Sequence, residues 1–126
     1  LCDAASTAGR LSNRSAGAAQ GVAGLGGLQR VADVPVYSTD SVVRRASALQ
    51  RTADAKAPAV GLPSTLWAQL GLQSGDKVKV SQGGASAVLP AREDATLAAN
   101  AVRVAAGHAA TSALGPMFGA LTVEKA

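Results

Sequence analysis

The chain has 126 residues and a formal net charge of +4, so it holds one small domain with an appendage. Aromatic residues make up only 2% of it, and the core must therefore be built from valine, leucine and alanine, with Trp67 expected as its large anchor. The basic residues are scattered, which predicts a solvated basic surface rather than a nucleic-acid interface. Cys2 is the only cysteine, which excludes an internal disulfide and an iron–sulfur cluster within these residues.

The N-terminal residues 1–28 are rich in glycine and alanine and show no sustained period. They are predicted to be a linker, the run-out of a preceding domain. The chain starts at Leu1 instead of methionine, so we expect a fragment or a processed chain. The apolar stretch 16–28 is too short to span a bilayer and lacks the layout of a secretory signal, so no membrane insertion is expected.

The first expected strand covers residues 31–37, with Pro35 placing it at a sheet edge or a strand start. Ser38-Thr39-Asp40 then forms a typical N-cap cluster for a short amphipathic helix. On that helix Val42, Val43, Ala46 and Leu49 form the apolar face, and Arg44, Arg45 and Arg51 lie outside. Residues 58–62 read as a short buried strand.

The stretch 64–84 gives the strongest local signals in the chain. Residues 64–70 predict a short helix that ends at Gly71, where a left-handed cap residue belongs. In the turn 74–76, Gly75 should supply a positive φ, and the Asp76 carboxylate can accept hydrogen bonds from nearby backbone N–H groups. A strand then starts at Lys77, with alternate valines inward and lysines outward, and it leads into a glycine hairpin turn.

The last third of the chain predicts three further strands, over residues 85–89, 101–105 and 121–124. A loop is expected over 90–100 and another over 109–119. In total, about six short strands and two short helices indicate a small barrel.

Few residues could carry chemistry. His108 is the only histidine, and a loop histidine after a glycine is more often bonded to backbone or solvent than catalytic. Glu93-Asp94 reads as a solvated acidic spot rather than an acid–base couple. One histidine and one cysteine cannot form a closed zinc site, and no phosphate-binding glycine motif is present. We therefore expect no catalytic residue, no metal site and no bound cofactor, with Arg44, Arg45 and His108 as weak binding candidates.

Leu70-Gly-Leu-x-x-Gly-Asp-x-Val-x-Val80, followed by a glycine hairpin, resembles the signature of the double-psi β-barrel that closes molybdopterin-dinucleotide oxidoreductases. The flanking segments 34–46, 100–108 and 114–124 are similar to the C-terminal part of an iron–sulfur subunit of bacterial NADH–quinone oxidoreductase, respiratory complex I. The resemblance covers residues 29–126 and implies a small, mainly β, double-psi barrel there.

The resemblance also implies a function. The domain would be a non-catalytic assembly domain, and the electron-transferring enzyme would be its parent complex, whose chain binds iron–sulfur clusters upstream. Its expected partners are the preceding domains of the same chain and other peripheral-arm subunits, on the cytoplasmic side of the bacterial inner membrane.

Two alternatives follow from the same residues. A true molybdopterin guanine dinucleotide domain of a formate-dehydrogenase-like enzyme would share the fold. Against it, relatives that bind the cofactor have Thr-Gly-Arg after the first strand, where this chain has Ser38-Thr39-Asp40, and a carboxylate repels a phosphate. They also have Asn-x-Leu-Thr near the end, where this chain has Ser112-Ala-Leu-Gly115. The other alternative, a basic barrel that binds nucleic acid, lacks the clustered charge and the aromatic platform.

Overall fold

The computed structural model describes residues 26–52, 55 and 57–126. It is mainly β. The strands are β1 (Gln29–Val31), β2 (Val60–Leu62), β3 (Lys77–Gln82), β4 (Ala85–Glu93), β5 (Ala101–Val104), β6 (Phe118–Ala120) and β7 (Thr122–Lys125). The helices are α2 (Ser41–Arg45), α3 (Ser47–Gln50) and α4 (Ser64–Gln69), with 3-10 turns η1 (Val36–Ser38) and η2 (Ala109–Thr111). Residues 1–25, which include most of the expected linker, lie outside the described residues.

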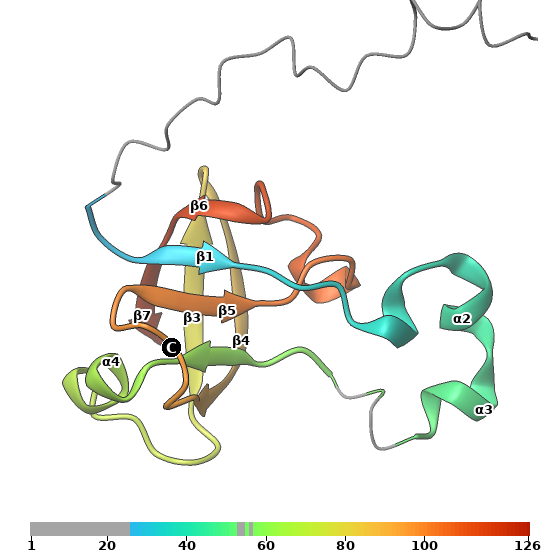
Figure 1. Ribbon diagram of the computed structural model, residues 1–126, viewed down its shortest axis with the longest axis horizontal. Coiled ribbons are helices and arrows are strands. Elements are labelled where there is room, and N and C mark those ends of the chain that lie inside the picture. Colours follow the sequence, from blue (N-terminus) through green and yellow to red (C-terminus); the bar gives the residue numbers. More distant parts are fainter. Residues whose placement is uncertain (1–25, 53–54, 56) are drawn as a thin grey trace, which may run out of the picture.

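The seven strands close into a barrel. Their order in the sheet is β6-β1-β5-β2-β4-β3-β7, and the two end members are separated along the chain only by the buried Leu121. One bent segment therefore pairs with β1 through its first half and with β3 through its second half. Because the two end strands of this order belong to one segment, the sheet closes on itself with six strand positions. Figure 1 shows β6 beside β1.

The pairing pattern has an internal two-fold symmetry. Parallel pairs join β1 to β5 and β2 to β4, and the other neighbours are antiparallel. Exchanging β1 with β4, β2 with β5, and β3 with the β6–β7 segment leaves every pair in place. The sequence shows a trace of this symmetry, because Leu-Gly-x-x-x-Gly occurs at residues 70–75 and again at 114–119. Gly75 and Gly119 both have a positive φ, +97° and +143°.

The core consists of aliphatic side chains that alternate inward along the strands. Six residues with no exposed surface lie at its centre: Val60, Leu62, Val78, Val80, Val102 and Val104. The expectation that Trp67 anchors the core was wrong, because its side chain is only half-buried and packs against the rim of this cluster. A barrel this narrow is filled by valine and leucine, and the indole packs against that core only partly buried.

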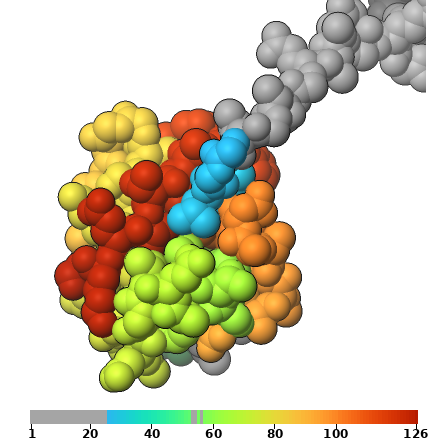
Figure 2. All heavy atoms as spheres, turned by 90° about the vertical axis from the view of Figure 1, so that its left-hand side faces the viewer, coloured from blue at the N-terminus to red at the C-terminus, as the bar shows by residue number. Residues whose placement is uncertain are grey.

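The central stretch folds as the sequence predicts. Helix α4 is followed by Gly71 at a φ of +57°, and Gly75 adopts the predicted positive φ. The Asp76 carboxylate accepts a hydrogen bond of 3.0 Å from the Gln73 backbone N–H. In β3, Val78 and Val80 are buried while Lys77 and Lys79 are exposed. Figure 2 shows α4 beside the C-terminal strand, where the Lys125 ammonium reaches the Gly71 carbonyl oxygen at 3.4 Å.

Several boundaries were wrong. The loop expected over residues 109–119 holds η2 and the start of β6, so the described residues form seven strands and three helices instead of about six and two. The first strand covers 29–31 instead of 31–37. Residues 32–35 have no regular structure and η1 begins at Val36, because Pro35 has no N–H to donate to a strand partner. The single helix expected over residues 41–49 is divided into α2 and α3 by Ala46, which has an extended conformation with ψ of 90°. Strand β4 continues past Pro90 to Glu93, because its second part leaves β3 and pairs with β2.

Candidate functional site

The most distinctive surface of the molecule is an excursion, defined here as residues 36–51, which connects β1 towards β2. It carries η1, α2 and α3 and projects to one side of the barrel (Figure 1). None of the residues of these three elements is buried. The barrel core therefore does not hold the excursion in place, and its shape depends on local hydrogen bonds.

Local caps determine the shape of the excursion. The Asp40 carboxylate accepts hydrogen bonds from the Val42 and Val43 backbone N–H groups, both at 2.8 Å, and so starts α2. The Gln50 side-chain amide donates to the Tyr37 and Val43 carbonyl oxygens, at 2.9 and 3.0 Å. These two bonds fold α3 back onto η1 and the end of α2, so the excursion is a compact unit.

Arg44 and Arg45 lie on α2, and both are exposed. Arg44 folds back towards the preceding turn, where its guanidinium donates to the Ser38 carbonyl oxygen at 2.8 Å. Both arginines are exposed, as expected, but the guanidinium of Arg44 is bound to the preceding turn. The turn before α2 presents a capping carboxylate and a carbonyl oxygen that is already paired, so it offers no convergent set of donors for a phosphate.

His108 lies at the root of the excursion. A Cβ on the neighbouring Gly107 would lie 3.0 Å from Val34 Cγ1 and 3.8 Å from the Ser38 carbonyl oxygen, so this turn packs closely against the segment that leads to α2. His108 Nδ1 accepts a hydrogen bond of 3.1 Å from the Ala110 backbone N–H and caps η2. The structure thus brings the turns at 38–40 and 107–108 together, but it uses the imidazole as a cap.

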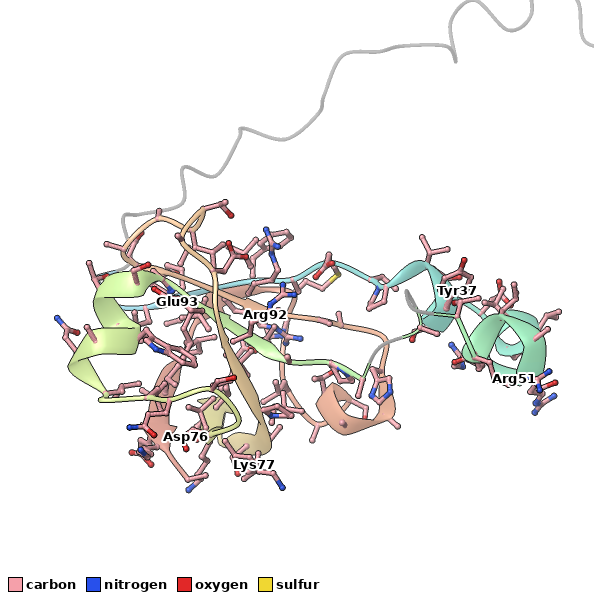
Figure 3. The ribbon with its side chains drawn as sticks, turned by 90° about the horizontal axis from the view of Figure 1, so that it is seen from below. Tyr37, Arg51, Asp76, Lys77, Arg92 and Glu93 are labelled. Atoms are coloured by element: carbon pink, nitrogen blue, oxygen red, sulfur yellow. The ribbon has the colours of Figure 1, made fainter. Side chains whose placement is uncertain are left out.

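Apolar side chains are exposed on the excursion. Val36 and Val42 are 71% and 76% exposed, and Leu49 is 37% exposed. The only acidic residue within the excursion is Asp40, whereas Arg44, Arg45 and Arg51 are basic. In Figure 3 Arg51 lies at the outer end of the excursion, away from the barrel, and Tyr37 lies nearer to its root.

A cleft of about 380 Å³ separates the barrel from the excursion root. It is lined by Asp33, Pro35, Ala57, Pro58, Ala59, Arg92, Arg103 and Ala105. Arg103 forms an ion pair of 3.2 Å with Asp94. Hydrogen bonds from Thr96, together with the charges of Arg103 and Arg92, hold the pKa of the Asp94 carboxyl below its usual value. The basic charge at this cleft is therefore largely compensated, which weakens it as an anion site.

The described part of the chain offers little for catalysis. Within it, no group of three or more histidine, cysteine, aspartate or glutamate side chains could hold a metal ion. Glu93 and Asp94 do not form an acid–base pair, since Asp94 is bound to Arg103 and Thr96 while Glu93 is exposed. Over the described ranges, no helix is long and apolar enough to cross a membrane.

The sequence analysis missed a buried hydrogen-bond cluster around Arg30. Arg30 in β1 is only 2% exposed, and its guanidinium makes five hydrogen bonds inside the barrel. Four acceptors are the carbonyl oxygens of Val104, Ala105, Gly115 and Pro116, and the fifth is Gln82 Oε1. Burial lowers the pKa of Arg30. All five acceptors lie at least 52 residues away, so no local pattern could reveal the cluster.

Comparison with known proteins shows likeness at the level of structure only. No protein-family model matches the chain, and no curated protein matches its sequence. The rationally designed protein mkDPBB_sym_86 aligns with a TM-score of 0.48 at 22% identity, over 80% of this chain and 96% of that one. The computationally designed msDPBB_sym2 aligns with a TM-score of 0.45 at 22% identity, over 54% of this chain and 79% of that one.

Acetylene hydratase from Pelobacter acetylenicus aligns with a TM-score of 0.44 at 19% identity, over 64% of this chain. The alignment spans 11% of that enzyme's length. None of these likenesses bears on function. The closed six-position barrel, with its two parallel pairs and internal two-fold, is the small double-psi β-barrel that the sequence predicts.

Proposed function

We propose that this chain is a non-catalytic assembly domain, which binds a neighbouring protein through its excursion. The observation that carries the proposal is the contrast between a filled, closed barrel and an excursion in which none of the helical residues is buried. Exposed apolar side chains gathered on one projecting unit are a mark of a protein contact site.

The specific assembly that we propose is the peripheral arm of bacterial NADH–quinone oxidoreductase, with this domain at the C-terminus of an iron–sulfur subunit. The support is the residue resemblance over 29–126, in which the quoted segment 34–46 covers the first part of the excursion. The parent chain would carry the iron–sulfur clusters, and the domain would lie on the cytoplasmic side of the inner membrane against other peripheral-arm subunits.

Deletion of residues 29–126 from the parent subunit tests this proposal. The subunit, with and without the domain, is produced together with the other peripheral-arm subunits, and assembled arms are isolated by size. We expect the deletion to lower the yield of assembled arms while NADH oxidation per assembled arm is retained. Normal yield with lost activity per arm would instead show a catalytic role and overturn the proposal.

The cofactor-binding alternative has a direct test of its own. A dinucleotide pyrophosphate needs converging donors, yet Asp40 caps α2, Arg44 is bound to a carbonyl oxygen, and His108 caps η2. Calorimetry at micromolar concentrations should therefore show no saturable binding of GDP or of molybdopterin guanine dinucleotide. Stoichiometric binding that is lost in Arg44→Ala or Arg45→Ala would favour the cofactor domain over the assembly domain.

A further inference from the structure

We infer that the excursion docks onto a partner protein whose contact surface is apolar at its centre and rimmed by aspartate and glutamate. The inference rests on the proposed assembly function and adds the chemistry of the partner. The docking surface is defined by the exposed apolar residues Val36, Val42 and Leu49 and by the arginines Arg44, Arg45 and Arg51.

The apolar part of the docking surface is concentrated in one segment. Eight large hydrophobic residues are exposed in the described part of the chain, and five of them lie between residues 31 and 49: Val31, Val34, Val36, Val42 and Leu49. Three of these, Val36, Val42 and Leu49, lie within the 16 residues of the excursion, and Val34 leads into it. The barrel, which has far more residues, exposes Val31 on β1 together with Val88, Met117 and Phe118. Single exposed apolar side chains are ordinary, but a concentration on one projecting unit indicates a contact site.

The charge of the docking surface determines which partner fits. Three arginines surround the apolar residues in sequence, and the one carboxylate, Asp40, is occupied by two backbone N–H groups of α2. Arginine forms two parallel hydrogen bonds to a carboxylate, which makes it suited to an acidic rim. One guanidinium nitrogen of Arg44 donates to the Ser38 carbonyl oxygen at 2.8 Å and one of Arg51 to that of Ser47 at 3.2 Å, which leaves the other donors of each for a carboxylate. Arg45 ends α2 and Arg51 follows α3, so an acidic rim would have to surround the excursion.

The same charges argue against a second copy of this chain. A two-fold symmetric contact places the same patch on both sides. Two patches that each carry Arg44, Arg45 and Arg51 would then be brought together, and like charges across a contact are unfavourable.

The short elements argue against a lipid surface. A helix that lies in a membrane interface needs one apolar face that continues over several turns. Here α2 has five residues and α3 has four, with the extended Ala46 between them, so the apolar side chains come from separate short elements. A shaped protein surface fits this arrangement.

The docking surface is held in shape before any partner binds. Gln50 connects α3 to η1 and to α2, and Gly107 allows the barrel to approach Val34 at the excursion root. A surface that is already ordered loses less conformational entropy on binding, so a small contact can still be specific.

Site-specific photocrosslinking in the cells that make the full-length parent protein tests the inference. A benzophenone-bearing residue replaces Val42 or Val36, and the matched control replaces Val88, which is 56% exposed on β4 of the barrel. We expect one crosslinked protein from positions 36 and 42, at least tenfold above the control, with the attachment point in an apolar segment flanked by acidic residues. Crosslinks to lipid, to a second copy or to a segment without acidic residues would overturn the inference, and so would a yield equal to the control.

The identity of the crosslinked partner separates this inference from the proposed function. An acid-rimmed partner outside respiratory complex I would support the docking surface and refute the complex I assignment. Incorporation into the complex I peripheral arm with crosslinks from position 88 alone would support the complex I assignment and refute the docking surface.

A charge swap provides the second measurement. Arg44→Glu with Arg45→Glu should lower the crosslinking yield from position 42 about tenfold, and arginine in place of the mapped acidic residues of the partner should restore it. Lys77→Glu with Lys79→Glu is the matched control, since these lysines are exposed on β3 and carry the same charge change. An equal loss in both double variants, or a loss that the partner's arginines do not restore, would contradict the acidic rim.

Discussion

Replacing Arg30 by methionine should destabilise the barrel more than any other single charge removal. The guanidinium donates five hydrogen bonds, at 3.0 to 3.3 Å, to acceptors on β3, at the end of β5 and in the segment before β6. Hydrogen bonds to charged groups each contribute about 1.5–3 kcal/mol. Adding up the five hydrogen bonds overstates the loss of stability, because the methionine variant no longer buries a charge. Burying that charge is unfavourable, and for the same reason burial lowers the pKa of Arg30.

Arg30→Met leaves neutral buried acceptors without a donor, at about 1–3 kcal/mol for each group, and we expect a net loss of about 3–5 kcal/mol. Urea unfolding followed by Trp67 fluorescence measures it, since Trp67 is the only tryptophan and packs against the core. With a slope of about 1–3 kcal/mol per molar urea, the midpoint should fall by roughly 2 M.

Two further variants decide whether the hydrogen bonds are the cause. Arg30→Lys keeps the charge but offers three donors in place of five, so it should lose an intermediate amount. Arg45→Met removes an exposed arginine and should leave the midpoint nearly unchanged. If Arg30→Met were as stable as the parent protein, or as stable as Arg45→Met, the reasoning from buried acceptors would be refuted.

Three other predictions concern turns and carboxylates. Gly75→Val should lower the free energy of unfolding by roughly 1–3 kcal/mol through strain alone, because φ is +97° and no atom lies within 4 Å of the new Cβ; an unchanged denaturation midpoint would contradict it. Gly107→Ala should lower it by a similar amount, about 1–3 kcal/mol, since strain is joined by a 3.0 Å contact with Val34, and a midpoint equal to that of the parent would refute the close packing. Hydrogen bonds from Lys125 and the Gln73 backbone lower the pKa of Asp76, and that of Asp94 is lowered too, so their stabilisation is present above the unfolded pKa of about 3.9 and is lost as the pH falls through the folded values. A melting temperature that stayed constant below pH 4, or fell equally in Asp76→Asn, would count against this assignment.

The sequence predicted the parts of the fold that local geometry determines. The turn after α4 follows from glycines that must adopt positive φ, and the alternation in β3 follows from the two-residue period of a strand. These features depend on residues a few positions apart. They could be predicted because each of these local patterns is compatible with only one backbone conformation.

The missed features depend on partners far along the chain. Past Pro90, strand β4 changes its partner from β3 to β2, about 30 residues earlier in the sequence. No local pattern predicts that change of partner. Arg30 is inward because its acceptors converge from three distant segments. For the candidate site, the exposure of Arg44 and Arg45 was predicted from the helix pattern, whereas the hydrogen bond from Arg44 to Ser38 was not, because it requires the turn geometry.

The bent β6–β7 segment has a consequence for how the chain folds during synthesis. Strand β1 pairs only with β5 and β6, which follow it by about 70 and 90 residues. Strand β3 finds its second neighbour only when β7 has been made. Until then two strand edges are open at once, and open edges invite pairing with other chains. Barrel closure is therefore a late and slow event, so the nascent domain is most exposed to aggregation just before β6 and β7 leave the ribosome.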